Sequence, residues 1–249
     1  MSDIAQWHSR RGAPDGGSLV TRAIDAVTGH IRANGLRVGD TLPGEAHFAE
    51  ELGVSRAVMR EAFGALAALR LVDVGNGRKP RVGAVDGSVF AASLDHAIST
   101  AQITVPDVWD VRRTIEVRTA ALAAEKRTDA EAARIVDLAD AMARDSHDRA
   151  ALTVHDIAFH EAIARASHNA LFVQIVDSFG PLMQVAVPAA WGTRTTERQR
   201  RSIITQHQAL ARAIADGDPQ RAAAEMEAHF DASVGDLLKS MAGGEHNDR

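Results

Sequence analysis

The sequence contains no cysteine and no tyrosine, and aromatic residues make up only 4% of it. Without cysteine the chain forms no disulfide and offers no thiolate to a metal, so any bound metal must take nitrogen and oxygen ligands. The scarcity of aromatic residues and the abundance of alanine favour helices packed through small aliphatic side chains over sheets. These features predict a mainly α protein in a reducing compartment, and we expect the cytoplasm.

Long apolar runs and an excess of positive charge are also missing. No stretch of about 18 apolar residues occurs, and the N-terminus has no cationic start followed by an apolar run, so we expect no membrane association and no export. The formal net charge of -5 argues against a histone-like protein that binds nucleic acid through charge alone, but it permits a local basic surface. The 249 residues suffice for one large or two ordinary domains.

The pattern of apolar and turn residues divides the chain into four segments. Residues 1–17 carry glycine, proline and scattered charges without an apolar period, which is typical of a flexible arm. Residues 18–85 combine helical periods with two short β-prone runs, and residues 86–243 are helical in period throughout. Residues 244–249 are expected to form a disordered tail. The predicted fold is an N-terminal winged helix-turn-helix followed by an all-α helical bundle.

The helix-turn-helix is predicted from two helices joined by a glycine corner. The first covers 45–52, Gly53 allows the tight corner, and Ser55 can cap a second helix that runs to about Leu69. Two β-prone runs within 71–85 then flank a basic, glycine-rich tip, which predicts a two-stranded wing.

The second of these helices has the side chains that a DNA-reading helix needs. Arg56 and Arg60 lie one turn apart on one face. Ser55 and the exposed amides at the helix N-terminus can bind a phosphate, and an arginine fork matches the edge of guanine. The alternative is that both arginines are solvated surface residues. The buried side is predicted to comprise Val58, Ala62, Phe63 and Leu66.

These residues also resemble a known family. The segments Leu42-Pro43-Gly44-Glu45, Leu52-Gly53-Val54-Ser55-Arg56 and Arg60-Glu61-Ala62, followed by Leu66 and the basic wing, closely resemble the winged helix-turn-helix of GntR regulators. The resemblance implies that Ser55, Arg56 and Arg60 contact operator DNA, with Asn76 and Gly77 approaching the minor groove. Two positions depart from the pattern: Ala46 stands where a basic residue is common, and Arg70-Leu71 where glycine is common. Three basic residues of the wing could offset the loss at Ala46: Arg78, Lys79 and Arg81.

The rest of the chain predicts helices that can close into a bundle around a cavity. Their expected ranges are 88–100, 106–127, 129–146, 149–167, 169–187, 194–216 and 218–241. Asp156 and His160 lie at i and i+4, so they share one helix face, and His207 and His229 stand on two later helices. Three imidazoles and one carboxylate would suit zinc, nickel, manganese or iron. A histidine taken singly is more often an ordinary surface or hydrogen-bonded residue, and that role is expected for His147, His155 and His168.

The helical segment resembles the FCD effector domain of the FadR-like branch of the GntR family. The resemblance rests on Val111-Arg112-Arg113-Thr114-Ile115-Glu116, Asp156-Ile157-Ala158-Phe159-His160-Glu161, Ser167-His168-Asn169, His207, Gly217-Asp218 and His229. It implies that Asp156, His160, His207 and His229 bind a divalent metal and that Arg112 points into the cavity to pair with an effector carboxylate. An alternative for Arg112 is a salt bridge to Glu116 on the helix exterior. Three large residues are expected to be ordinary core rather than cavity lining: Trp109, Met183 and Trp191.

Together these features predict a regulator of transcription, with repression the expected mode, that binds a palindromic operator as a homodimer and senses a small organic acid at a metal. One rival is a metal-dependent hydrolase that uses the same Asp/His site with Glu161 or Glu225 as base. Another is an architectural DNA-binding dimer with a structural metal. No residue pattern selects the effector, the metal, the operator or the direction of the ligand's effect.

Overall fold

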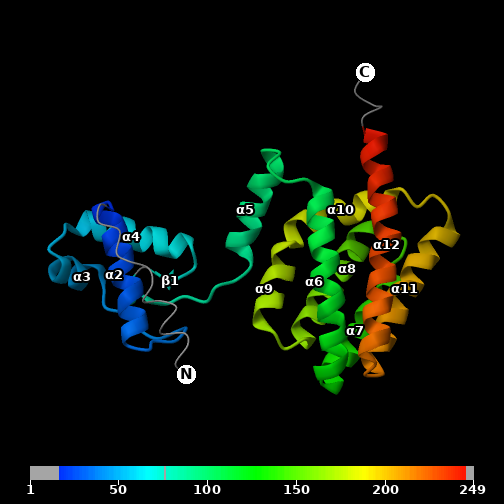
Figure 1. Cartoon of the computed structure of the whole chain (residues 1–249), viewed down its shortest axis with the longest axis horizontal. Helices are drawn as coiled ribbons and strands as arrows, with labels where there is room; N and C mark the ends of the chain where they lie inside the picture. Colours follow the sequence, from blue (N-terminus) through cyan, green and yellow to red (C-terminus); the bar gives the residue numbers. More distant parts are fainter. Residues whose placement is uncertain (1–16, 76, 245–249) are drawn as a thin grey trace. The chain divides into compact units, whose positions relative to one another are not determined.

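The computed structural model describes residues 17–75 and 77–244, with side chains through residue 233, and it divides the chain into two compact units, residues 1–85 and 86–249. Apart from a two-stranded hairpin, the described elements are all α-helices, which confirms the mainly α fold (Figure 1). Nearly all of the expected arm and tail, together with Asn76, lie outside the described residues.

The N-terminal unit is a winged helix-turn-helix, as the sequence predicts. Helices α2 (Leu19–Ala33), α3 (Glu45–Leu52) and α4 (Arg56–Ala68) pack around one core, and β1 (Val72–Asp73) pairs antiparallel with β2 (Arg81–Val82). The core of this unit contains Ala23, Val27, Leu42, Phe48, Met59, Ala62, Phe63, Leu66 and Val72.

Local sequence explains the geometry of the α3–α4 corner. Gly53 ends α3 in the left-handed region at φ 63°, where a residue without Cβ is favoured. The Ser55 hydroxyl then accepts a hydrogen bond from the Val58 amide and caps α4. Of the residues predicted for the buried face, Val58 packs against the core but is only partly buried, and Met59, which the prediction left out, is fully buried. Met59, Ala62, Phe63 and Leu66 follow the i, i+3, i+4, i+7 spacing of one helix face.

The base of the wing requires close backbone approach. Arg70 has φ 60°, the left-handed region that favours glycine, which matches the family pattern from which the sequence departs here. A Cβ on Gly83 would collide with the main-chain oxygen of Arg70. Gly83 therefore lets the second strand of the wing pass against the end of α4.

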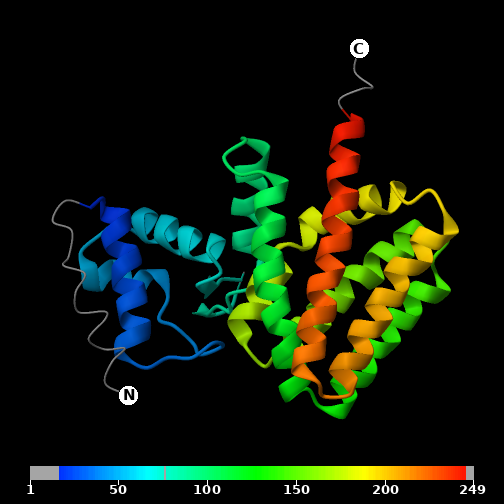
Figure 2. The same cartoon turned by 45° about the vertical axis from the view of Figure 1, so that its right-hand side comes forward.

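The C-terminal unit is an all-α bundle, which Figures 1 and 2 show from two sides. Helix α6 packs against α8 and α12, and α11 packs against α7 and α12, while α5 lies against α9 and α10. The helices are α5 (Ser88–Ser99), α6 (Val105–Lys126), α7 (Asp129–Arg144), α8 (Arg149–Ala166), α9 (Ala170–Ser178), α10 (Gly180–Gly192), α11 (Glu197–Ala215) and α12 (Pro219–Gly244).

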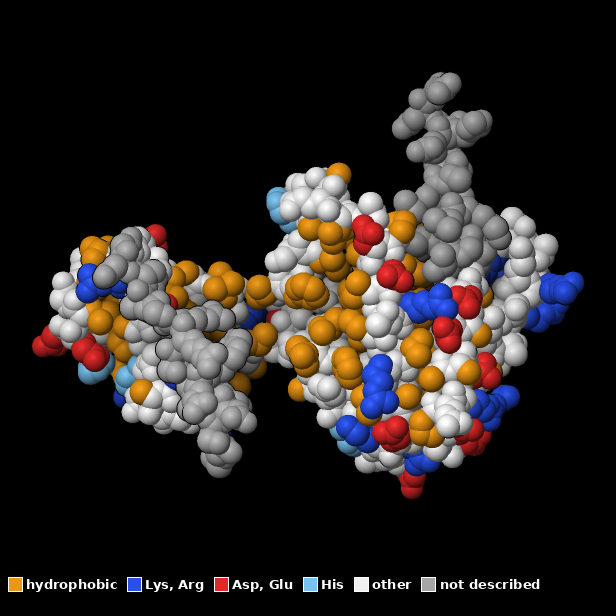
Figure 3. Space-filling view, viewed as in Figure 1, with side chains coloured by type: hydrophobic (Ala, Val, Ile, Leu, Met, Phe, Trp, Pro, Cys, Tyr) orange, Lys and Arg blue, Asp and Glu red, His pale blue; other side chains and the backbone are white. Residues whose placement is uncertain are grey.

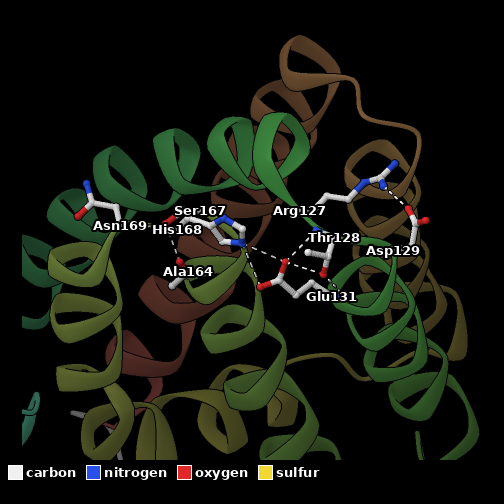
Figure 4. Close-up of polar contacts among 8 residues, drawn as sticks. All are labelled: Arg127, Thr128, Asp129, Glu131, Ala164, Ser167, His168 and Asn169. Atoms are coloured by element: carbon white, nitrogen blue, oxygen red, sulfur yellow. Dashed lines mark hydrogen bonds and ion pairs between the residues drawn. The ribbon is translucent and has the colours of Figure 1, made fainter.

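Hydrogen bonds link two neighbouring helix connections of the bundle. Thr128 and Glu131 form a capping box at the start of α7, with each side chain bonded to the other's backbone amide. His168, in the turn between α8 and α9, places Nε2 3.1 Å from both carboxylate oxygens of Glu131 (Figure 4). The carboxylate of Glu131 thus joins the α6–α7 corner to the α8–α9 corner.

The prediction of one helix over 169–187 is wrong. The segment forms two helices, α9 and α10, bent by 55° at Phe179. Pro181 stands in the first turn of α10, where its missing N–H is tolerated, but it could not have continued α9. Helix α10 then runs through Pro188 to Gly192, where the sequence predicted a break. No single described helix is long and apolar enough to span a membrane; α9 and α10 reach that length and composition only as a bent pair.

Candidate functional site

A cavity of about 40 Å³ lies in the C-terminal unit, among α6, α8, α10, α11 and α12. Its wall is largely apolar, with a cluster of polar side chains on one part of it. The polar and charged residues of the lining include Arg112, Asp156, His160, Arg194, His207 and His229. All four residues that the sequence predicts as metal ligands are among them, so the bundle brings together side chains from three helices that are far apart in the sequence.

The three histidines of this cluster are close enough to share one ion. Their candidate ligand atoms all lie within 4.8 Å of one another, and all three residues, His160, His207 and His229, are buried. The Asp156 carboxylate joins them through Oδ1, which lies 3.2 Å from Nε2 of His207. Helix α8 supplies Asp156 and His160 from one face, as their i, i+4 spacing predicts.

The hydrogen bonds of His207 show why a cation fits here. Nδ1 of His207 lies 2.8 Å from the main-chain oxygen of Ile203, which can only accept, so Nδ1 carries a proton. In a neutral ring Nε2 then has a lone pair, and this lone pair faces the Asp156 carboxylate. Two acceptors at this distance are stabilised by a positive charge between or beside them, either a second proton on the ring or a metal ion.

The pKa shifts of Asp156 and His229 favour the protonation states that bind a metal. Burial would raise the pKa of Asp156, but the hydrogen bond with Nε2 of His207 and the positive charge that the neighbouring histidines carry when protonated hold it well below its usual range, so the group is a carboxylate. Burial and the neighbouring His207 and His160 hold the pKa of His229 well below its ordinary value, so its ring is neutral. Nδ1 of His229 is buried without a hydrogen-bond partner in the part of the chain that the structure describes. The carboxylate of Asp156 and the neutral imidazole of His229 are thus in the forms in which these groups bind a divalent metal.

Arg112 is buried and lines the cavity, but it is not directed at the cavity alone. Its Nε donates to Oε1 of Glu116 at 2.7 Å, and both residues are almost inaccessible, at 4% and 1% exposure. The alternative predicted from the sequence, a salt bridge on the helix exterior, is therefore right about the partner and wrong about the place. The Arg112 guanidinium also contacts the sulfur of Met183 and lies 5.0 Å from the centre of the Trp109 ring.

Glu116, predicted from the sequence only as a partner of Arg112, also contacts one of the candidate metal ligands. Its Oε2 lies 2.5 Å from Nδ1 of His160, on the opposite side of that ring from Nε2. Burial would raise the pKa of Glu116, but the charges of Arg112 and His160 keep it below its ordinary value. A carboxylate behind a histidine fixes its ring orientation and tautomer, as in carboxylate–histidine–metal arrangements. The signal was present in the spacing, since Glu116 lies one turn after Arg112.

Two tryptophans that the sequence predicts as core residues lie at the cavity. Trp109 and Trp191 are buried, as core residues would be, but both also line the cavity.

Glu161 borders a smaller hollow beside Asp156 and His160, and burial together with Asp177 raises its pKa. Glu225 pairs with Arg221 at 4.0 Å and is not among the residues found to line the cavity. Two histidines have ordinary carboxylate partners, His155 with Asp145 at 2.8 Å and His168 with Glu131, while His147 is exposed.

In the N-terminal unit, Arg56 and Arg60 are exposed on α4, and Ser55 is exposed at its cap. In the wing, Gly77 turns the chain at φ 74°, and Nη2 of Arg78 bonds to both oxygens of Asp73, at 2.8 and 3.0 Å. Asn76 lies outside the described residues.

Comparison with protein families matches both units. Residues 19–82 match the model described as bacterial regulatory proteins, gntR family, and residues 107–232 match the FCD domain. The chain belongs to the GntR family. It is a DNA-binding transcription regulator whose helical unit is an FCD effector-binding domain, as the sequence predicts. The hydrolase alternative has no support from this membership, because the family consists of DNA-binding regulators rather than enzymes.

Several members of the GntR family are similar over most of the chain. The chain is 31% identical to HTH-type transcriptional regulator LutR of Bacillus subtilis strain 168, with 84% of this chain and 95% of LutR covered. It is 33% identical to the Glc operon transcriptional activator of Escherichia coli strain K12, covering 76% and 78% of the two chains. It is 29% identical to the galactonate operon transcriptional repressor of the same strain, covering 75% and 83%.

A solved structure of a GntR protein from Streptococcus agalactiae has the same fold. It superimposes with a TM-score of 0.61 at 22% identity, covering 86% of this chain and 97% of the other.

Proposed function

We propose that this GntR regulator binds a palindromic operator as a homodimer and that a small hydroxy acid, held with a divalent metal in the FCD domain, lowers its affinity for DNA. The observation that carries the proposal is the cluster of Asp156 with the buried His160, His207 and His229, all of which line one cavity. Placing a carboxylate and three imidazoles together away from water costs free energy unless they are hydrogen-bonded or bind an ion, so a bound metal would account for the cluster.

DNA contact is assigned to the exposed face of α4 and to the wing. Ser55, Arg56 and Arg60 would reach the major groove, where arginine can bond to guanine and the helix N-terminus can bind phosphate. At the wing tip, Asn76, Gly77 and Arg78 would approach the minor groove. Arg78 would then exchange its carboxylate partner, Asp73, for the DNA backbone.

Zinc, nickel, manganese or iron would be held by the carboxylate of Asp156 and by the three imidazoles. These ions accept mixed nitrogen and oxygen ligands, and the chain has no thiolate to offer a softer site. When bound, the metal supplies a Lewis-acidic centre for the carboxylate or hydroxyl oxygens of a ligand. Glu116 holds His160 in the tautomer that leaves Nε2 available to the ion.

Cavity size favours a short acid. A water molecule needs about 10–15 Å³ of such volume, so about 40 Å³ accommodates only a few heavy atoms unless side chains move. One relative is a repressor of a galactonate operon, and galactonate is a hydroxy acid, although a larger one. The relative favours a hydroxy acid and the cavity volume favours a short one, so we propose a short 2-hydroxy acid, for which L-lactate is the test compound. Its carboxylate would face Arg112.

A second copy of the chain would cover an apolar groove on the helical unit. The groove, about 310 Å³, lies between α5, α6 and α9, and its lining is almost entirely apolar. Phe90 and Val111 on its rim are 52% and 49% exposed, and Figure 3 shows apolar side chains gathered over these helices. Exposed apolar surface of this kind favours an interface, and two half-sites of a palindrome require two copies of α4.

The direction of the response follows from a difference in ligand affinity between two arrangements of the dimer, typically about 1–3 kcal/mol. The relatives include both an activator and a repressor. We propose the repressor mode, in which the acid releases the operator.

The test combines metal analysis with binding to DNA. The purified wild type should contain nearly one metal per chain, L-lactate should raise its melting temperature, and L-lactate should weaken binding to an operator selected from random duplex DNA. Operator binding that ignores every acid, with metal present, would instead favour an architectural dimer with a structural metal. A metal-free protein would overturn the metal-dependent part of the proposal.

A further inference from the structure

The indole of Trp109 has an unsatisfied donor. Trp109 is 5% exposed and lines the cavity, and its Nε1 is buried without a hydrogen-bond partner among the described residues. A buried indole N–H usually has a partner, so an orphaned one needs an explanation. Its place in the cavity wall suggests that the partner is a ligand.

The neighbours of this N–H indicate what kind of ligand atom would accept it. Trp109 precedes Arg112 by three residues, so both project from one face of α6, and the guanidinium lies 5.0 Å from the indole ring centre. Arg194, on the segment between α10 and α11, is a second buried guanidinium in the same cavity. The cavity lining thus carries two guanidinium groups in addition to the indole N–H, which suits an anionic ligand.

The lining also contains groups that can accept hydrogen bonds or bind a metal. Asp156 and the neutral His229 are the carboxylate and the imidazole that the metal would engage. A hydroxy acid bridging both parts would place one set of oxygens at the metal and turn a carboxylate oxygen toward α6. The remaining lining includes apolar side chains such as Ile203 and Ile204, which offer no competing acceptor.

We propose that Trp109 is a specificity-determining residue of the effector site and that its indole N–H donates a hydrogen bond to a carboxylate oxygen of the acid. This inference rests on the proposed sensing function. It adds that the site selects for the carboxylate through a neutral donor as well as through Arg112. A site built to hydrogen-bond an oxygen discriminates strongly against analogues that cannot accept the bond.

Trp109→Phe tests the inference, because it removes the N–H and retains an aromatic ring. With zinc-loaded protein, the dissociation constant of L-lactate, measured by calorimetry, should rise about tenfold or more, the usual effect of losing a hydrogen bond to a charged acceptor. Trp191→Phe is the matched control, since Trp191 lines the same cavity but its Nε1 is not among the fully buried atoms without a partner; a change of less than about threefold is expected. Zinc content should be unchanged in both variants.

A second measurement separates the hydrogen bond from the shape of the ring. The chain has three tryptophans, so ¹⁵N-labelled indoles give at most three N–H resonances, and the resonance absent from Trp109→Phe belongs to Trp109. Adding L-lactate should shift that resonance downfield. Benzothienylalanine at position 109, in a Trp7→Phe, Trp191→Phe background, keeps the ring shape without the N–H and should weaken binding as Trp109→Phe does.

The outcomes distinguish this inference from the function on which it depends. If the wild type binds L-lactate and both the Phe variant and the benzothienylalanine protein bind it equally well, the role of Trp109 is refuted while the sensor site stands. If zinc-loaded wild type binds neither L-lactate nor any other small hydroxy acid, the proposed sensing function fails first.

Discussion

Nδ1 of His160 lies 2.5 Å from Oε2 of Glu116, and both side chains are buried. Glu116 in turn accepts a hydrogen bond from Arg112, which lines the cavity. One carboxylate therefore connects a residue of the proposed effector site with a residue of the proposed metal site. A change at Glu116 is therefore expected to affect both His160 and Arg112.

Glu116→Gln should weaken metal binding without removing a ligand. The amide can still accept a bond from His160, but its neutral charge no longer favours the polarised ring, and losses of about 10- to 100-fold in metal affinity are usual for such partners. Competition with a chromophoric chelator measures the affinity. Glu125→Gln, on an exposed position of the same helix, is the control. Equal zinc affinity in wild type and Glu116→Gln would show that this carboxylate has no influence on the ligand.

His207→Ala should abolish stoichiometric metal and leave DNA binding intact. The substitution removes a ring that contacts Asp156 and lies 4.5 Å, centre to centre, from the His229 ring. Elemental analysis and operator titration measure the two properties separately. His155→Ala is the matched control, because that ring pairs with Asp145 at the C-terminal cap of α7, and its metal content should equal that of the wild type. Full metal occupancy in His207→Ala would exclude His207 as a ligand.

Arg60→Ala and Arg78→Ala should weaken DNA binding in different ways. Loss of Arg60 should remove about 1–3 kcal/mol of discrimination at one base position, while loss of Arg78 should weaken binding to all sequences and reduce the salt dependence by about one phosphate contact. Titration of operator and scrambled duplexes at several salt concentrations measures both effects. Arg144→Ala, exposed at the end of α7, should bind DNA like the wild type. Unaltered sequence preference in Arg60→Ala would contradict the assignment of α4.

Val111→Glu should shift the protein from dimer to monomer. Val111 is 49% exposed and borders the apolar groove between α5, α6 and α9, so a carboxylate there would be buried unpaired in the proposed interface. Analytical ultracentrifugation at several concentrations measures the dimer dissociation constant, which should rise at least tenfold. Val154→Glu, at an exposed position of α8 that does not line this groove, should leave it unchanged. An undiminished dimer of Val111→Glu would place the interface on another surface.

Acid should remove the stabilising contribution of Glu131. Its pKa is lowered, chiefly by the hydrogen bond from the Thr128 amide and also by His168, so the folded state favours the carboxylate. Such a group stabilises the fold above its unfolded-state pKa of about 4.3, and the contribution is lost as the pH falls through the lower folded-state value. Urea unfolding should show wild type more stable than Glu131→Gln by up to about 1 kcal/mol at pH 6, and the difference should shrink as the pH falls through the lowered pKa.

A control separates charge from capping in this experiment. Gln retains the capping-box oxygen at this position, so the difference reports the charge on Glu131 and its contact with His168 (Figure 4). Asp129→Asn, at a fully exposed neighbour in the same first turn, should show a smaller difference. A gap between wild type and Glu131→Gln that stays constant from pH 6 to pH 3 would contradict the assignment.

Sequence patterns alone predicted much of this protein, because they act over short distances along the chain. Glycine at 53, the serine cap at 55 and the apolar spacing of α4 specify a helix-turn-helix locally. The i, i+4 spacing places Asp156 and His160 on one face. The union of these residues with His207 and His229 was expected from resemblance to a family, and the structure brings the four together. Which bases α4 contacts, and which metal binds, stay predictions.

Tertiary structure decided the features that depend on what covers a helix face. The period of α6 shows that Trp109, Arg112 and Glu116 share one side, but not that α8, α10 and α12 bury that side. Burial places the Arg112–Glu116 salt bridge, which the sequence offered as an alternative on the surface, in the interior and brings Glu116 to His160. It also left the N–H of Trp109, a residue that lines the cavity, without a hydrogen-bond partner among the described residues. A sequence determines which side chains lie together on a helix; only the packing of other helices determines what those side chains meet.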